Sequence, residues 1–135
     1  MTKKKFSIDS VVLKLVREDA RYAIAMIRSG HIEVAYEMLS RKLGYSMPEV
    51  HVGPENMRAW PGAAAICRKE EGKIVIRFRD QRISESYFTA LHEYGHAIAY
   101  SEGLALNPHD DELWATEFET RMVELAELKG LRSDY

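Results

Sequence analysis

The sequence predicts an α+β fold, in which helices at both ends of the chain enclose a small β-sheet. Apolar residues recur at three- and four-residue spacing in the first and last thirds of the chain, as in amphipathic helices. Between them, residues 47–78 contain short runs of alternating apolar and polar side chains separated by glycine and proline, as in strands and a hairpin. The 135 residues contain no repeat or long linker, so one domain over 1–135 is expected.

The first third of the chain is predicted to form two helices. The first covers residues 8–27, with Asp9 or Ser10 as the capping residue. The second covers 32–43 and ends at Gly44, because glycine readily adopts the left-handed conformation that ends helices. Both helices are expected to serve as a packed scaffold.

Extended segments follow in the middle of the chain. Residues 47–52 are expected to form one strand, and residues 63–68 and 73–78 to form a hairpin with its turn at 69–72. The connecting loop at 55–62 is expected to be exposed. In the second hairpin strand, one face is expected to pack on a core, and it carries Ile74, Ile76 and Phe78. The other face carries Lys73, Val75, Arg77 and Arg79.

The last third of the chain returns to helix. One helix is expected over 85–102, capped by Ser84 and followed by a turn at 104–109. The final helix is expected over 110–128 and ends at Gly130. It begins with two aspartates, which suit the positive end of the helix dipole.

The composition argues against several function classes. Nineteen Lys and Arg against twenty-one Asp and Glu leave no basic excess, so no nucleic-acid partner is expected. No stretch reaches the roughly 18 to 20 apolar residues that span a bilayer, so no membrane partner is expected. The basic start MTKKKF is followed by Asp9 and Lys14, which interrupt the apolar core of a signal peptide. Cys67 has no second cysteine to pair with, and we expect a cytoplasmic protein of unspecified oligomeric state.

The residues that carry chemistry lie in the helix expected over 85–102. It contains His-Glu-Tyr-Gly-His from His92 to His96. Residues four apart lie on the same helix face, so the two histidines can bind one metal ion. Neutral imidazole suits zinc, and Glu93 beside the first ligand can take a proton from a zinc-bound water. A chain of this length and composition matches the pattern by chance only about 0.02 times.

This segment resembles the active-site helix of zincin metallopeptidases, including the uncharged residues that surround both histidines. The specific resemblance covers about residues 84–125, and the order of the elements before it is similar to a minimal zincin domain. The resemblance implies a peptide or protein substrate and a zinc ion held by His92, His96, a third residue and water. It also implies that Glu93 is the general base and returns its proton to the leaving amine.

The third ligand decides the subclass of zincin. The metzincin pattern requires glycine and histidine where this chain has Ala99 and Glu102, so that pattern fails. Gluzincins instead take a glutamate from a following helix. The options in this chain are Glu112, Glu117 and Glu119, with His109 as a further one.

Several gluzincin families share the pattern Glu-x-x-Ala-(Asp/Asn)-x-Phe, in which the first Glu binds the metal. This chain matches at Glu112, Ala115 and Phe118, while Thr116 replaces the usual Asp or Asn. A small residue at position 115 lets two helices approach closely, and Thr116 can still accept a hydrogen bond. We therefore favour Glu112, and an aminopeptidase-like register with Glu117 as the ligand stays open.

The resemblance also indicates how a substrate would bind. In zincins a peptide usually pairs with an edge strand beside the motif helix, and residues 63–66 would form that edge here. His109 and Tyr100 are the options for stabilising the oxyanion. The chain is similar to minigluzincins and to ImmA/IrrE-type peptidases, so we predict a small zinc metallopeptidase of the gluzincin type. The competing prediction is a zinc-binding regulatory or latent module with little or no turnover.

Overall fold

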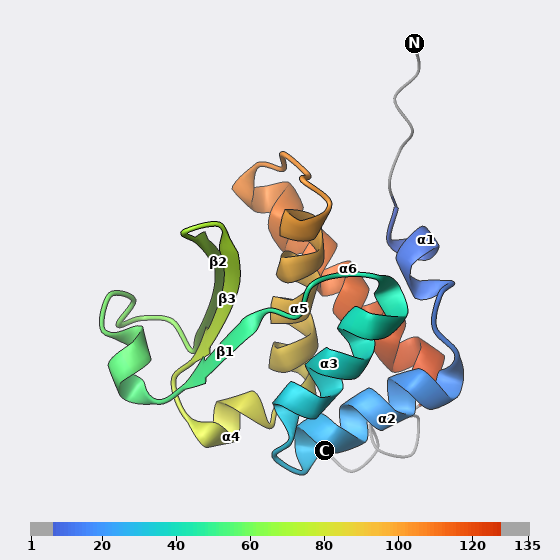
Figure 1. The fold of residues 1–135 in the computed structure, drawn as a ribbon, viewed down its shortest axis with the longest axis horizontal. Helices are drawn as coiled ribbons and strands as arrows, with labels where there is room; N and C mark the ends of the chain where they lie inside the picture. Colours follow the sequence, from blue (N-terminus) through green and yellow to red (C-terminus); the bar gives the residue numbers. More distant parts are fainter. Residues whose placement is uncertain (1–6, 128–135) are drawn as a thin grey trace.

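The computed structural model describes residues 7–127, and in that range the chain is a mixed α+β structure. Figure 1 shows the long helices gathered together beside a three-stranded sheet; they are α2 (Arg17–Arg28), α3 (Ile32–Leu43), α5 (Tyr87–Ser101) and α6 (Pro108–Ala126). One hydrophobic core joins these helices to the inner face of the sheet. The predicted fold class is therefore confirmed.

The single helix predicted over 8–27 is wrong, because two helices occupy this range. α1 (Ile8–Val12) is separated from α2 by a bend. At the end of the bend, Val16 is extended, and its backbone N–H donates a hydrogen bond to the Asp19 carboxylate at 3.0 Å. Leu15 within the bend is buried. The helical spacing of apolar residues therefore continues through a segment that is not helical.

The ends of the N-terminal helices follow local capping rules. α1 is capped by Ser7 rather than by Asp9 or Ser10, because the Ser7 hydroxyl oxygen accepts a hydrogen bond from the Ser10 backbone N–H at 3.3 Å. α3 has the predicted limits and ends at Gly44, whose φ of 82° is left-handed. α2 and α3 pack against each other and form the predicted scaffold.

The sheet has the strand order β1–β3–β2. β1 (Glu49–Val52) runs parallel to β3 (Lys73–Phe78), which pairs antiparallel with β2 (Ala65–Glu70). Glu71 and Gly72 form the turn of the predicted hairpin with φ values of 50° and 81°, and both are positive as a type I′ turn requires. β2 is thus an edge strand of this sheet, and it packs against α5.

The loop before β2 covers the outer face of the sheet, so the exposure predicted for 55–62 is wrong in part. A 3₁₀ turn, η1 (Pro54–Met57), packs against β3 and buries the side chain of Met57. Val75 was expected on an uncovered face and is buried as well. Arg79 holds this loop in place, because its Nη2 group donates hydrogen bonds to loop carbonyl oxygens.

The two C-terminal helices begin at positions other than those predicted. A short helix, α4 (Gln81–Ser84), precedes α5, so the cap of α5 is Ser86 rather than Ser84. α6 begins two residues earlier than predicted, because the side chain of Asn107 accepts a hydrogen bond from the Asp110 backbone N–H at 2.8 Å.

α6 ends at Ala126, before the end predicted at residue 128, because Glu127 adopts a left-handed conformation with a φ of 56°. The stop predicted at Gly130 and the assessment of the MTKKKF start lie outside the described residues. Among residues 7–127, no helix combines the length and the apolar character required to cross a lipid bilayer. Within this range, the most extensive packing between helices joins α5 to α6.

Candidate metal centre

α5 and α6 pack so closely that residues of α6 reach the histidines of α5. Gly95 of α5 faces Ala115 of α6, where neither residue has a large side chain. The indole N–H of Trp114 donates a hydrogen bond to the Gly95 carbonyl oxygen at 2.9 Å, which ties the two helices together at this level. Glu112 lies about one turn before Ala115 on α6 and is brought to the histidine face of α5.

His92, His96 and Glu112 form a compact cluster. The Nε2 atom of His92 lies 3.0 Å from Oε1 of Glu112, and the Nε2 atom of His96 lies 3.0 Å from Oε2. One potential ligand atom from each residue lies within 4.8 Å of the others. The Glu112 side chain is 64% exposed, whereas that of His96 is only 9% exposed, so the cluster lies at the mouth of a partly buried site.

Two further carboxylates from α6 contact the other ring nitrogens of the histidines. The Nδ1 atom of His92 is hydrogen-bonded to Oε1 of Glu119 at 3.3 Å, and Nδ1 of His96 lies 3.1 Å from Oδ1 of Asp111. This hydrogen bond, together with nearby negative charge, raises the pKa of His92 although burial opposes the shift. A carboxylate at Nδ1 favours a proton on that nitrogen and leaves the Nε2 lone pair available to a metal ion.

Glu93 lies beside the cluster in a buried position. It is 7% exposed, and its Oε1 atom has no hydrogen-bond partner within the described residues. Burial raises the pKa of the Glu93 carboxyl, while the neighbouring histidines oppose this shift. A cavity of about 240 Å³ is lined by Glu93, His96, Asp111 and Glu112 and by residues 65–68 of β2. A carboxyl group in this environment is suited to accept and to donate a proton.

The structure separates the predicted options for the third ligand. Glu112 contacts the Nε2 atoms of both histidines. Glu117 is exposed, and its carboxylate lies 3.9 Å from the guanidinium of Arg121. Glu119 contacts Nδ1 rather than Nε2, and His109 is exposed at the start of α6 and does not line the site cavity. The geometry favours Glu112, and its assignment as a ligand stays a prediction.

The hydrogen-bond acceptor for a ligand histidine is a residue other than Thr116, which was expected in that role. Thr116 is exposed, and Glu119 makes the contact instead. A signal for Glu119 was present, because it follows Glu112 by seven residues, or about two helical turns, and therefore shares its face. Asp111 was interpreted only as a residue that starts the helix, although it directly precedes Glu112 on the chain.

Four further residues with reactive side chains lie outside the cluster of His92, His96 and Glu112. Tyr100 is 37% exposed rather than packed, and burial, together with nearby negative charge, raises its pKa. Cys67 is a free thiol that packs against the core, and burial raises its pKa. His51 lies 2.7 Å from Glu49, and His31 is exposed, so neither belongs to the histidine cluster.

Comparison of the chain with protein-family models, with curated proteins and with solved structures found no significant match. The residues of the site and their geometry are therefore the basis for a functional assignment.

Proposed function

We propose that the protein is a small zinc-dependent peptidase. The proposal rests on one observation: the ligand atoms of His92, His96 and Glu112 converge beside Glu93, whose buried carboxyl has an oxygen without a partner in the described residues. Two imidazole nitrogens and one carboxylate oxygen are a donor set that zinc takes in proteins, with a position left for water. The resemblance of the His-Glu-x-x-His segment to the zincin active-site helix agrees with this assignment.

The chain supplies both the ligands and the groups that orient them. His92, His96 and Glu112 would hold the ion, while Glu119 and Asp111 would fix the orientation and tautomer of the histidine rings. Bound zinc supplies a Lewis acid that polarises a carbonyl group and lowers the pKa of a coordinated water.

Glu93 would move the proton during peptide-bond hydrolysis. Its carboxylate accepts a proton from the attacking water and returns that proton to the nitrogen of the leaving amine. A glutamine at position 93 has no carboxylate and could not transfer this proton.

The substrate would lie along β2. This strand is an edge of the sheet, and residues 65–68 line the same cavity as Glu93 and His96. An extended peptide can add to such an edge through backbone hydrogen bonds, which places its carbonyl groups next to the histidine cluster. The cytoplasmic location of the protein stays a prediction.

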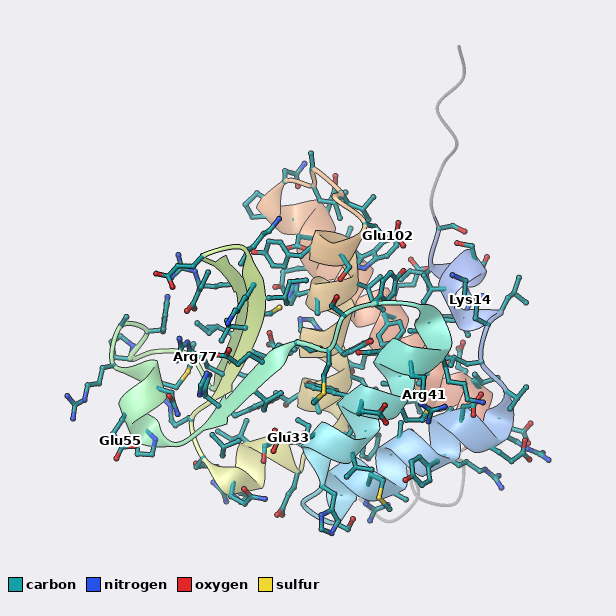
Figure 2. All side chains as sticks on the ribbon, viewed as in Figure 1. Lys14, Glu33, Arg41, Glu55, Arg77 and Glu102 are labelled. Atoms are coloured by element: carbon teal, nitrogen blue, oxygen red, sulfur yellow. The ribbon has the colours of Figure 1, made fainter. Side chains whose placement is uncertain are left out.

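The proposal is tested by measuring bound zinc and cleavage of a broad peptide library on the same preparations. The wild type should carry near-stoichiometric zinc and cleave peptides, and His96→Ala should lose the zinc. Glu93→Gln should keep the zinc and lose cleavage. Glu33→Gln is the matched control, because Glu33 is exposed on α3 (Figure 2) and does not line the site cavity.

Two results would overturn the proposal. A wild type that binds no zinc would remove the metal centre altogether. A wild type that binds zinc but cleaves nothing would assign the chain to the competing hypothesis, a zinc-binding regulatory or latent module.

A further inference from the structure

The edge strand β2 carries basic residues on both of its faces beside the site. Ala65 and Cys67 pack against the core, so Lys69, which follows in the same alternation, lies on the face towards α5. Arg68 lies on the opposite face of the strand. Both side chains are exposed, and Arg68 also lines the cavity that contains Glu93.

Arg68 is positioned but not neutralised. Its guanidinium lies 5.1 Å from the centre of the Trp60 ring, close enough for a cation–π contact. The neighbouring acid on this face, Glu70, is instead bound by Arg77 at 2.7 Å. Within residues 7–127, Arg68 forms no ion pair. The aromatic ring thus holds a positive charge at the cleft without consuming its hydrogen-bond donors.

The positive charge continues towards the β2–β3 turn. Lys69 and Lys73 line a second cavity of about 580 Å³, together with Tyr100, which lies one helical turn after His96. In the described part of the chain neither lysine forms an ion pair, and the carboxylate in this cavity, Glu49, is hydrogen-bonded to a histidine at 2.7 Å. We call Arg68, Lys69 and Lys73 the basic end of the cleft.

The opposite charge dominates the other end of the cleft. Glu93, Asp111, Glu112 and Glu119 gather around the histidines. The carboxylates thus surround the histidines, whereas Arg68 at the wall of the same cavity and the two lysines of the second cavity form no ion pair within residues 7–127. Cations that form no ion pair beside an edge strand are suited to bind carboxylates of a peptide that pairs there.

We propose that the basic end of the cleft selects substrates by their carboxylates, so that the preferred substrate is an acidic peptide. The inference rests on the peptidase function proposed above. A peptide strand added to β2 presents successive side chains to opposite faces, so consecutive acidic residues would meet Arg68 on one face and Lys69 on the other. The carboxylate could come from acidic side chains or from the free C-terminus of the peptide.

The test compares matched fluorogenic peptides that differ only in charge. One pair carries Asp or Asn at the residues flanking the cleaved bond, and a second pair ends in a free or an amidated C-terminus. The ratio of kcat/KM for the charged over the uncharged peptide should exceed one and should fall in Arg68→Gln and Lys69→Gln, by about two- to fivefold for each charge removed. Added salt should reduce the same ratio, because these side chains are exposed.

Lys14→Gln is the matched control, since it removes the same charge from an exposed residue. Figure 2 shows Lys14 near α1, on the other side of the molecule from Arg77 and the sheet. This variant should leave the ratio unchanged. A higher kcat/KM for the Asp peptide than for the Asn peptide assigns the carboxylate to side chains. A higher kcat/KM for the peptide with a free C-terminus than for its amide assigns the carboxylate to the C-terminus. Either result supports the proposal when Arg68→Gln reduces the ratio.

Equal cleavage of charged and uncharged peptides by the wild type would overturn the selectivity and leave the peptidase function intact. Absence of all cleavage would instead count against the peptidase function. In that case, binding of the same peptides to zinc-loaded Glu93→Gln, measured by fluorescence polarisation, still decides the selectivity. Equal binding of both peptides of each pair would reject it.

Discussion

A Cβ atom placed on Gly95 would lie 2.9 Å from the Cα atom of Ala115 and 3.2 Å from its carbonyl oxygen. The backbones of α5 and α6 therefore touch at this level, and no side chain fits between them. Glu112 lies about one turn from Ala115 on one helix, and both histidines lie within a turn of Gly95 on the other. This backbone contact sets how closely the potential ligand atoms approach one another.

Gly95→Ala should destabilise the fold and weaken zinc binding together. Overpacking a close contact typically costs about 1 to 3 kcal/mol of unfolding free energy. This cost is expected to exceed the gain of about 1 kcal/mol from replacing glycine by alanine within a helix. Thermal unfolding and competition with a chromogenic chelator measure the two effects. Because the clash is with backbone atoms, adding Ala115→Gly should not restore either property, and restoration would contradict the backbone contact.

Glu112→Gln should weaken zinc binding markedly, whereas Glu117→Gln should change it little. The first substitution replaces an anionic oxygen with a neutral one at the histidine cluster, and the second alters an exposed residue beside Arg121. Zinc dissociation constants for both variants decide between the two registers. Loss of the metal in Glu117→Gln alone would show that the aminopeptidase-like register is right.

Glu119→Gln should reduce zinc affinity by about tenfold or more without removing a ligand, because residues that orient ligand histidines have effects of this size. The neutral amide holds the His92 ring less firmly than the carboxylate at 3.3 Å. Zinc affinity and thermal stability are measured in parallel, with Glu117→Gln as the control on the same helix. A lower melting temperature with unchanged affinity would assign Glu119 a purely structural role.

Stability should fall at alkaline pH because a buried tyrosine resists ionisation. Burial raises the pKa of Tyr94 to about 12, above the unfolded value of about 10. Its contribution is therefore fully present below about pH 10 and is lost as pH rises through about 12, which amounts to about 3 kcal/mol. Denaturant unfolding at increasing pH should show this decline, and Tyr94→Phe should make it shallower. An unchanged slope in the variant would contradict the assignment.

The sequence predicted the elements whose signals are local. α3 ends at Gly44 as expected, because the left-handed cap is a property of one residue. The bend between α1 and α2 was missed because Leu15 stays buried and continues the helical spacing through a segment that is not helical. Burial of Val75 was missed because the packing of η1 against β3 joins segments that are apart in the sequence, and no pattern within β3 indicates it.

The same distinction applies to the candidate site. His92 and His96 lie on one helix, so their spacing alone predicted that they face the same way. The position of Glu112 depends on how α6 crosses α5. The small residue Ala115 indicated a close approach of the two helices but not their crossing geometry. The contact between Glu119 and His92 joins two helices over twenty-seven positions, and it lies two helical turns beyond Glu112, whereas the family pattern places the acceptor one turn beyond it.

The potential metal ligands and the residues that orient them all come from the hairpin of α5 and α6, whereas the wall along which a substrate would lie comes from β2. These are separate elements, and the close helix contact at Gly95 does not involve the strand. A substitution at position 66 or 68 can therefore reshape the wall while every potential ligand atom keeps its place. Evolution of such a scaffold can change what is bound, one strand residue at a time, without having to rebuild the reacting centre.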